Sequence, residues 1–130
     1  MHAEPIQQSA GLEKTSRSQY FTSLKSKKRI AGLFTKGGKA FGKSLMIRYA
    51  KGEVMNPPFQ VVFAVSKKTG DAPLRTRVKR RLREALFAIM KAGEVKSAGF
   101  DVAIIPKKDV ADLDFAVLCD ELRVALKKLR

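Results

Sequence analysis

The sequence has little of what several protein classes require. Among its 130 residues there are one cysteine, one histidine and no tryptophan. A lone Cys119 cannot form an internal disulfide, and without a Cys/His cluster a zinc site is excluded as well. No run of about 18 apolar residues occurs, which excludes a membrane-spanning helix. The opening residues, MHAEPIQQSAGLEK, lack the apolar stretch of a secretory signal, so we expect a cytoplasmic protein.

Acidic residues are also scarce, and the imbalance is local. The chain has 27 Lys and Arg against 12 Asp and Glu, a formal net charge of +15. Residues 1–13 carry a net charge of −2, residues 14–83 carry +17, and residues 84–130 carry zero. Such a concentrated field indicates a polyanionic partner, which can be nucleic acid, an anionic membrane surface or an acidic protein. A basic face that is merely solvated remains the alternative.

The length and a hydrophobic content of 45% predict one domain, over residues 21–130, with a core of ordinary size. Residues 1–20 are polar and aperiodic, and they predict a disordered N-terminal extension. Periodicity predicts a helix from Leu24 to Gly37-Gly38, strands at 45–49 and 59–66, a helix beginning near Pro73, a strand at 101–105 and a helix from about Asp114. This order indicates an α+β or open α/β class with one layer pair.

The segment SKKTGDAPLRTRVKRRLREAL, residues 66–86, carries most of the information. On a helical wheel its apolar residues form one stripe: Leu74, Val78, Leu82, Ala85, Leu86 and, beyond the segment, Ile89. The remaining arc is basic and is centred on Thr76. Six basic side chains on one helix repel one another, and phosphate groups would relieve that repulsion. Because the apolar stripe is needed to cover the strands, nucleic acid is favoured over a membrane surface.

The missing DNA-binding motifs and the aromatic residues of the predicted strands indicate which kind of nucleic acid is bound. Zinc ligands, heptads and a helix-turn-helix pair are missing, so the common DNA-binding motifs are not matched and no DNA partner is expected. Aromatic side chains at Tyr49, Phe59 and Phe63 on predicted strands suit stacking with single-stranded RNA, although alternating Phe and Val are also usual in a core. The residues alone therefore predict an RNA-binding domain.

Side chains for hydrolytic chemistry are poorly represented. The only histidine, His2, lies in the extension, and the basic segment has only the carboxylates Asp71 and Glu84. General acid–base catalysis needs a positioned His or carboxylate pair, and a two-metal nuclease needs several acidic ligands. We therefore expect neither a catalytic residue nor a metal site in this chain.

The segment VSKKTGDAPLRTRVKRRLRE resembles the signature of the bacterial ribonuclease P protein component. In that signature a Ser-Lys-Lys-x-Gly turn precedes a helix that opens Arg-Asn-Arg and continues with Lys-Arg and Arg-Glu. The residues in register are Ser66, Lys67, Lys68, Gly70, Arg75, Arg77, Lys79, Arg80, Arg83 and Glu84. Two positions depart from it: Thr76 replaces an Asn associated with RNA contact and nearby metal binding, and Pro73 is atypical. The resemblance covers about residues 22–130.

The resemblance implies an α/β sandwich with a sheet of roughly four strands, the fourth coming from a division of residues 40–66. It also implies a left-handed βαβ crossover, against the usual right-handed rule. The implied function is the protein subunit of the ribonucleoprotein that removes the 5′ leader from precursor tRNA. In that family the RNA subunit is the catalyst and binds the magnesium, while the protein binds the catalytic RNA and the precursor leader.

By the same resemblance, the residues expected to contact the catalytic RNA are Lys67, Lys68, Arg75, Thr76, Arg77, Lys79, Arg80 and Arg83. The precursor leader is expected in a cleft between the first helix and the sheet, touching Phe34, Tyr49, Ala64 and Ser66. Two other functions stay open. A ribosomal or RNA-chaperone protein would bind structured RNA without a role in cleavage, and a protein nuclease would cleave RNA by itself.

Overall fold

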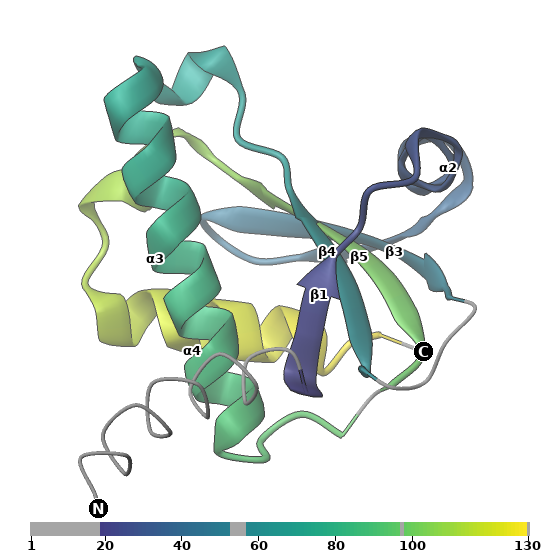
Figure 1. Ribbon diagram of the computed structural model, residues 1–130. Helices are drawn as coiled ribbons and strands as arrows, with labels where there is room; N and C mark the ends of the chain where they lie inside the picture. The colour runs from purple at the N-terminus through teal and green to yellow at the C-terminus, as the bar shows by residue number, and fades with distance from the viewer. Residues whose placement is uncertain (1–18, 53–56, 97, 130) are drawn as a thin grey trace, which may run out of the picture.

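The computed structural model describes residues 19–52, 57–96 and 98–129 (Figure 1). Its elements, in order, are β1 (Phe21–Ser23), α2 (Lys27–Lys36), β2 (Gly38–Phe41), β3 (Leu45–Lys51), β4 (Phe59–Phe63), the 3-10 turn η1 (Lys67–Thr69), α3 (Ala72–Lys91), β5 (Phe100–Pro106), the 3-10 turn η2 (Lys108–Asp112) and α4 (Phe115–Leu126). The predicted disordered extension lies outside the described residues, apart from Gln19 and Tyr20.

The five strands form one mixed sheet in the order β1-β4-β5-β3-β2. Strands β1, β4 and β5 run parallel, whereas β3 is antiparallel to β5 and β2 is antiparallel to β3. Strands β4 and β5 are parallel and are joined through α3, so they form a βαβ unit, and the left-handed crossover implied by the resemblance stays a prediction for it. The α+β class is confirmed, but the expected number of strands is one too few. The additional strand, β1, has only three residues, too few for an alternating pattern to reveal it, and it forms by pairing with Phe59–Val61 far along the chain.

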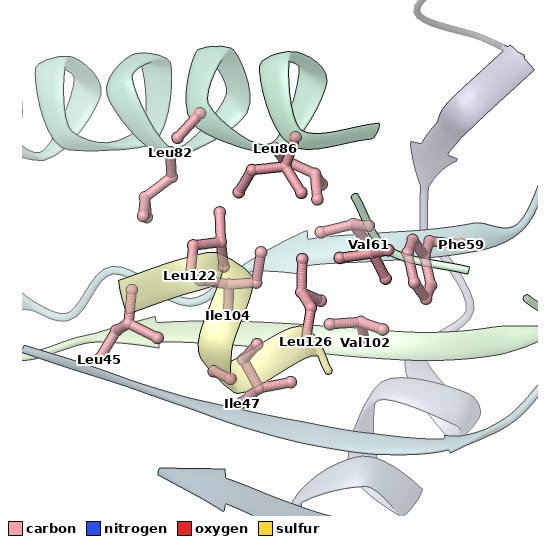
Figure 2. Packing of buried hydrophobic residues seen from close by; sticks show 14 of the residues in the cluster. Leu45, Ile47, Phe59, Val61, Leu82, Leu86, Val102, Ile104, Leu122 and Leu126 are labelled. Carbon is pink, nitrogen blue, oxygen red and sulfur yellow. The ribbon is translucent and has the colours of Figure 1, made fainter. Parts of the chain in front are cut away.

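The helices cover both faces of the sheet (Figure 1). Helices α3 and α4 lie on one face, and α2 lies on the other. Figure 2 shows Leu82 and Leu86 of α3 directed towards Ile104 of β5 and Leu122 of α4, in the larger of the two cores. The central strand β5 is buried at every position except the half-buried Ile105, as expected of a strand covered on both faces.

Helix α2 differs from its prediction in where it starts. It begins at Lys27 and not near Leu24, because the Ser26 hydroxyl accepts a hydrogen bond from the Arg29 amide (3.3 Å) and caps the helix. The buried Leu24 belongs to the preceding loop, where its amide donates to the Val61 carbonyl (2.9 Å). Leu33 is the buried residue of α2, whereas Phe34 is 42% exposed. Phe34 is therefore available at the surface.

The C-terminal helix follows its prediction closely. Helix α4 starts after Asp114, as expected, and buries an apolar stripe of four residues: Leu118, Leu122, Ala125 and Leu126. Phe115, at its first position, is 42% exposed and does not belong to that stripe. In the described part of the chain no helix combines the length and hydropathy needed to cross a membrane.

Candidate RNA interface

The basic segment begins with a tight turn. The Ser-Lys-Lys-x-Gly sequence forms η1, in which the Gly70 amide donates to the Lys67 carbonyl (3.2 Å). Gly70 has a φ of 151°, and a Cβ atom there would lie 2.5 Å from the Leu74 side chain. Only glycine fits both constraints. The turn leaves the side chains of Lys67 and Lys68 exposed at the start of α3.

Helix α3 is positioned by its cap and its apolar stripe. The Asp71 carboxylate accepts a hydrogen bond from the Leu74 amide (3.1 Å), and Pro73 lies in the first turn, where its missing amide is not needed. The buried residues of the helix are Val78, Leu82, Ala85, Leu86, Ile89 and Met90. Because this stripe is held against the sheet and α4, the opposite side of the helix must face solvent.

Six of the eight side chains predicted to contact the catalytic RNA are exposed: Lys67, Lys68, Thr76, Arg77, Lys79 and Arg80. We call the five charged ones and Thr76 the cationic face. Between Ser66 and Arg83 the only carboxylate is that of Asp71, which is occupied as the cap of α3. Glu84, directly after Arg83, is the other carboxylate of the segment, so five exposed cations outnumber two carboxylates along it. Guanidinium forks and ammonium groups in this density suit the phosphate oxygens of a polyanion.

Two further arginines of the predicted set are half-buried beside this face. The Arg83 guanidinium lies over the Phe63 ring, 5.5 Å from its centroid. Arg75 keeps its guanidinium Nε buried, without a hydrogen-bond partner among the described residues. Stacking of a base on Phe59 is excluded because that side chain is fully buried, and Phe63 already has a cation over its ring. Helix α3, rather than the aromatic strand residues, offers the accessible contacts.

The residues predicted for a leader cleft do not all meet. Phe34 projects from α2, and Ala64 and Ser66 follow the end of β4. Tyr49 instead points to the opposite face of the sheet, where it packs against Phe100 in the larger core (ring centroids 5.9 Å apart). The prediction that Tyr49 lines a cleft together with Phe34 is wrong. The reason is strand alternation, which puts Tyr49 on the same side as the buried Leu45 and Ile47.

Comparisons with known proteins agree with this arrangement. The family model described as Ribonuclease P matches residues 19–130. The ribonuclease P protein component of Paramagnetospirillum magneticum is 35% identical over 102 residues, covering 78% of this chain and 74% of the relative. That of Gluconacetobacter diazotrophicus is 31% identical over 105 residues, covering 81% and 88%. The chain belongs to the ribonuclease P protein family.

Solved structures of the same family share the fold. The ribonuclease P protein from Thermotoga maritima superposes with a TM-score of 0.70 at 22% identity, covering 83% of this chain and 97% of that protein. A Staphylococcus aureus ribonuclease P protein gives a TM-score of 0.66 at 24% identity, covering 83% and 93%. As a ribonuclease P protein, the chain is the protein component of an RNA-based endoribonuclease that processes tRNA, and its partner is RNA.

One basic residue of this ribonuclease P protein was expected to face solvent and does not. Arg81 lies in the predicted basic arc, yet its guanidinium donates to the carbonyls of Ala111 (2.9 Å) and Leu113. These carbonyls lie at the end of η2 and just after it, ahead of α4. Arg81 therefore ties that connection to α3, and its donors are used inside the protein.

We expect Arg81→Met to lower the free energy of unfolding by about 1–2 kcal/mol, because the carbonyls lose their donors while the methionine keeps the apolar stem. Urea denaturation measures this loss. Affinity for ribonuclease P RNA should stay within about twofold of the parent, because Nη1 and Nη2 of Arg81 are directed to backbone carbonyls of the protein. A tenfold loss of affinity in a folded variant would instead place Arg81 in the RNA interface.

Arg48 is a candidate site residue that sequence reasoning missed. It lies on the α2 side of β3, next to Tyr49 but on the other face, and its guanidinium donates to the Gly37 carbonyl (3.3 Å) at the end of α2. Its Nε is buried without a hydrogen-bond partner in the part of the chain that the structure describes. The alternation of Leu45, Ile47 and Tyr49 was the signal that could have identified it.

Among the described residues no cluster of three or more His, Cys, Asp and Glu side chains could hold a metal ion. Burial raises the pKa of the Cys119 thiol above its ordinary value, and the neighbouring Asp120 carboxylate raises it further. The thiol is therefore protonated at neutral pH and is a poor nucleophile.

Proposed function

We propose that this ribonuclease P protein binds the catalytic RNA through the cationic face of η1 and α3. The observation that carries the proposal is the exposure of Arg77, Lys79 and Arg80 on a helix whose opposite side is locked into the core. Because packing already fixes the helix backbone, this row of cations can follow an RNA backbone without a further cost of backbone ordering. Lys67 and Lys68 extend the row beyond the helix start, and Thr76 can donate or accept a hydrogen bond within it.

We also propose that the precursor leader lies along the side of α2 that carries Phe34. An exposed aromatic ring is a stacking platform for an unpaired base. Ala64 and Ser66 lie where β4 leads into η1, so a strand passing Phe34 towards them would approach the cationic face. We assign Arg48 in place of Tyr49 as a candidate contact of this leader, because Arg48 is on the α2 face.

Magnesium is proposed to be bound mainly by the RNA partner. Magnesium prefers oxygen ligands and is held in proteins by carboxylates together with phosphates. Among the described residues no group of three or more His, Cys, Asp and Glu side chains could hold a metal ion by protein ligands alone. The complex is proposed to work in the cytoplasm, where tRNA is processed in bacteria.

The decisive experiment is cleavage of a 5′-extended precursor tRNA at low magnesium. The full chain is tested alone, together with a bacterial ribonuclease P RNA, and against that RNA alone. Efficient cleavage at the mature 5′ end by the combination only is the expected result. Cleavage by the protein alone would mean that it carries its own catalytic residues. Binding without stimulation would favour the ribosomal or RNA-chaperone function, which shares the same charge and fold.

We expect Phe34→Ala to weaken the binding of a precursor with a long 5′ leader by about fivefold to tenfold, because a stacking ring is worth about 1–3 kcal/mol per base. Affinity is measured for the assembled complex with a long leader and with a single-nucleotide leader, and only the former should change. Phe41→Ala is the matched control, since Phe41 is also exposed but lies on β2. Equal losses with both leaders, or in both variants, would contradict the leader cleft.

A further inference from the structure

A cavity flanks α2 on the side away from Phe34. It has a volume of about 280 Å³ and lies between α2 and the end of β3. Its lining residues are Arg29, Gly32, Lys36, Ala50, Lys51 and Asp101. We call it the α2 hollow. None of its residues belongs to the cationic face or to the expected leader contacts.

The helix geometry separates this cavity from the leader side. Relative to the buried Leu33, each step along α2 turns about 100°, so Phe34 lies on one flank and Gly32 on the other. Arg29 and Lys36 share the flank of Gly32. A ligand in the α2 hollow would therefore be distinct from a base stacked on Phe34, although both would touch the same helix.

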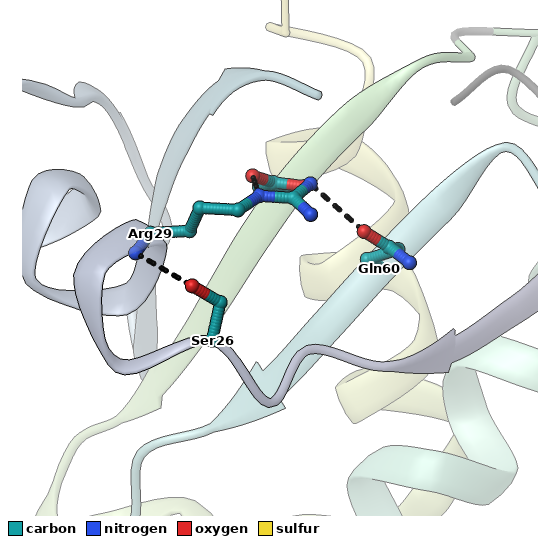
Figure 3. A network of polar contacts seen from close by, with 4 residues as sticks. Ser26, Arg29 and Gln60 are labelled. Carbon is teal, nitrogen blue, oxygen red and sulfur yellow. Dashed lines mark hydrogen bonds and ion pairs between the residues drawn. The ribbon is translucent and has the colours of Figure 1, made fainter. Parts of the chain in front are cut away.

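Two lining residues of the hollow, Arg29 and Asp101, form an ion pair, and Figure 3 shows how Arg29 also reaches Gln60. The Arg29 guanidinium donates from Nε to one carboxylate oxygen of Asp101 (2.8 Å) and from Nη2 to the other, and Nη2 also donates to Gln60 (2.8 Å). The Asp101 side chain is only 6% exposed. Since Arg29 already neutralises this carboxylate, Asp101 does not cancel the charges of Lys36 and Lys51 at the rim. The hollow as a whole is cationic.

Gly32 is an unusual residue for its place. It lies inside α2, where glycine is less favourable than alanine because of its larger loss of backbone freedom. Its packing does not demand glycine, because nothing lies within 4 Å of where a Cβ atom would be. Gly32 also lines the hollow, so this open space adjoins it. A missing side chain keeps the cavity open and lets a ligand approach the helix backbone closely.

We propose that the α2 hollow binds a phosphate group of an RNA strand, held by Lys36 and Lys51 above the Arg29–Asp101 pair. The proposal rests on the RNA binding proposed above and adds a contact remote from the cationic face. Helix α2 would then contact RNA on both flanks. The phosphate can come from the catalytic RNA or from the precursor leader, and the two arms of the experiment separate these sources.

The test compares Lys36→Ala/Lys51→Ala with Lys96→Ala/Lys127→Ala, a control that removes the same charge from exposed positions elsewhere. Affinity is measured from 50 to 200 mM salt, for ribonuclease P RNA alone and for long- and short-leader precursors with the assembled complex. With one of the two RNA sources, the catalytic RNA or the precursor leader, we expect Lys36→Ala/Lys51→Ala to bind about tenfold more weakly near 150 mM salt. The slope of log affinity against log salt concentration should also be smaller by one to two units. The control should lose less than about threefold, as expected of charges that touch no phosphate.

A second variant tests the cavity without changing charge. Gly32→Gln fills the hollow, and because it replaces a glycine inside a helix it should raise the thermal unfolding midpoint by about 2–4 °C. RNA affinity should nevertheless fall by about threefold or more, because the phosphate is displaced. Ala31→Gln, at the exposed neighbouring position, is the matched control and should leave affinity unchanged.

Arg77→Ala/Arg80→Ala is measured beside these variants to separate the two proposals. If it weakens RNA binding while Gly32→Gln and Lys36→Ala/Lys51→Ala bind like the parent in both arms, the α2 hollow is not an RNA site and the proposed function survives. If none of the variants weakens binding, the proposed function fails as well.

Discussion

Replacing Arg77 and Arg80 together by alanine is expected to weaken the binding of ribonuclease P RNA by about a hundredfold near 150 mM salt, since each charge-assisted contact contributes about 1.5 kcal/mol or more. Both side chains are exposed on α3 and have no structural partner among the interactions described above. The parent should lose about a thousandfold in affinity between 50 and 200 mM salt if about six phosphates are contacted. For the double variant, the slope of log affinity against log salt concentration should be smaller by about two units.

Direct titration of RNA at several salt concentrations measures both quantities. Lys96→Ala/Lys127→Ala removes the same formal charge away from α3 and controls for the overall field. Urea denaturation should give the same free energy of unfolding for the double variant as for the parent, within about 0.5 kcal/mol, because neither residue is buried. A shallow salt dependence of the parent would contradict the role of the cationic face. Unfolding of the variant would make these arginines structural.

Replacing Arg29 by alanine is expected to lower the free energy of unfolding by about 3 kcal/mol, because it leaves a buried carboxylate without its counter-charge. Asp101 lies in the central strand β5 and its side chain is 6% exposed, so water cannot readily replace the guanidinium. The same change detaches α2 from β4 and β5, since Arg29 also bonds to Gln60. Urea denaturation of the protein without RNA measures this effect.

The partner substitution provides the comparison. Asp101→Ala should cost less than Arg29→Ala, because Arg29 is 26% exposed and its freed guanidinium can turn towards solvent. The double variant should be less destabilised than the sum of the two single variants, as expected of residues in direct contact. Additive losses, or a loss below about 1 kcal/mol for Arg29→Ala, would mean that this ion pair does not hold α2 on the sheet.

Local signals in the sequence were enough to predict α3, the helix that carries most of the cationic face. The cap at Asp71, the proline in the first turn and the apolar stripe from Val78 to Ile89 depend on neighbours along the chain, and all are present in α3. Local signals did not predict the position of the Arg81 side chain. A wheel places its side chain in the basic arc, but the carbonyls it binds come from a connection about 30 residues later, and their position is set by packing of α4.

The sheet shows the same division between local and long-range information. Alternation in β3 already implied that Tyr49 shares a face with Leu45 and Ile47, yet which face α2 covers follows only from tertiary packing. The strand β1 and the Arg29–Asp101 pair are also products of long-range contacts, since their partners are separated by tens of residues.

The sequence by itself determined the family, the basic helix and its charge, because these are carried by residue types at fixed local spacing. The tertiary structure alone decided which cations are exposed, which face Phe34 and Arg48 share, and that a cationic hollow lies on the far flank of α2. The physical reason is that exposure and proximity depend on packing between elements distant in the chain, and spacing along one element does not encode that packing.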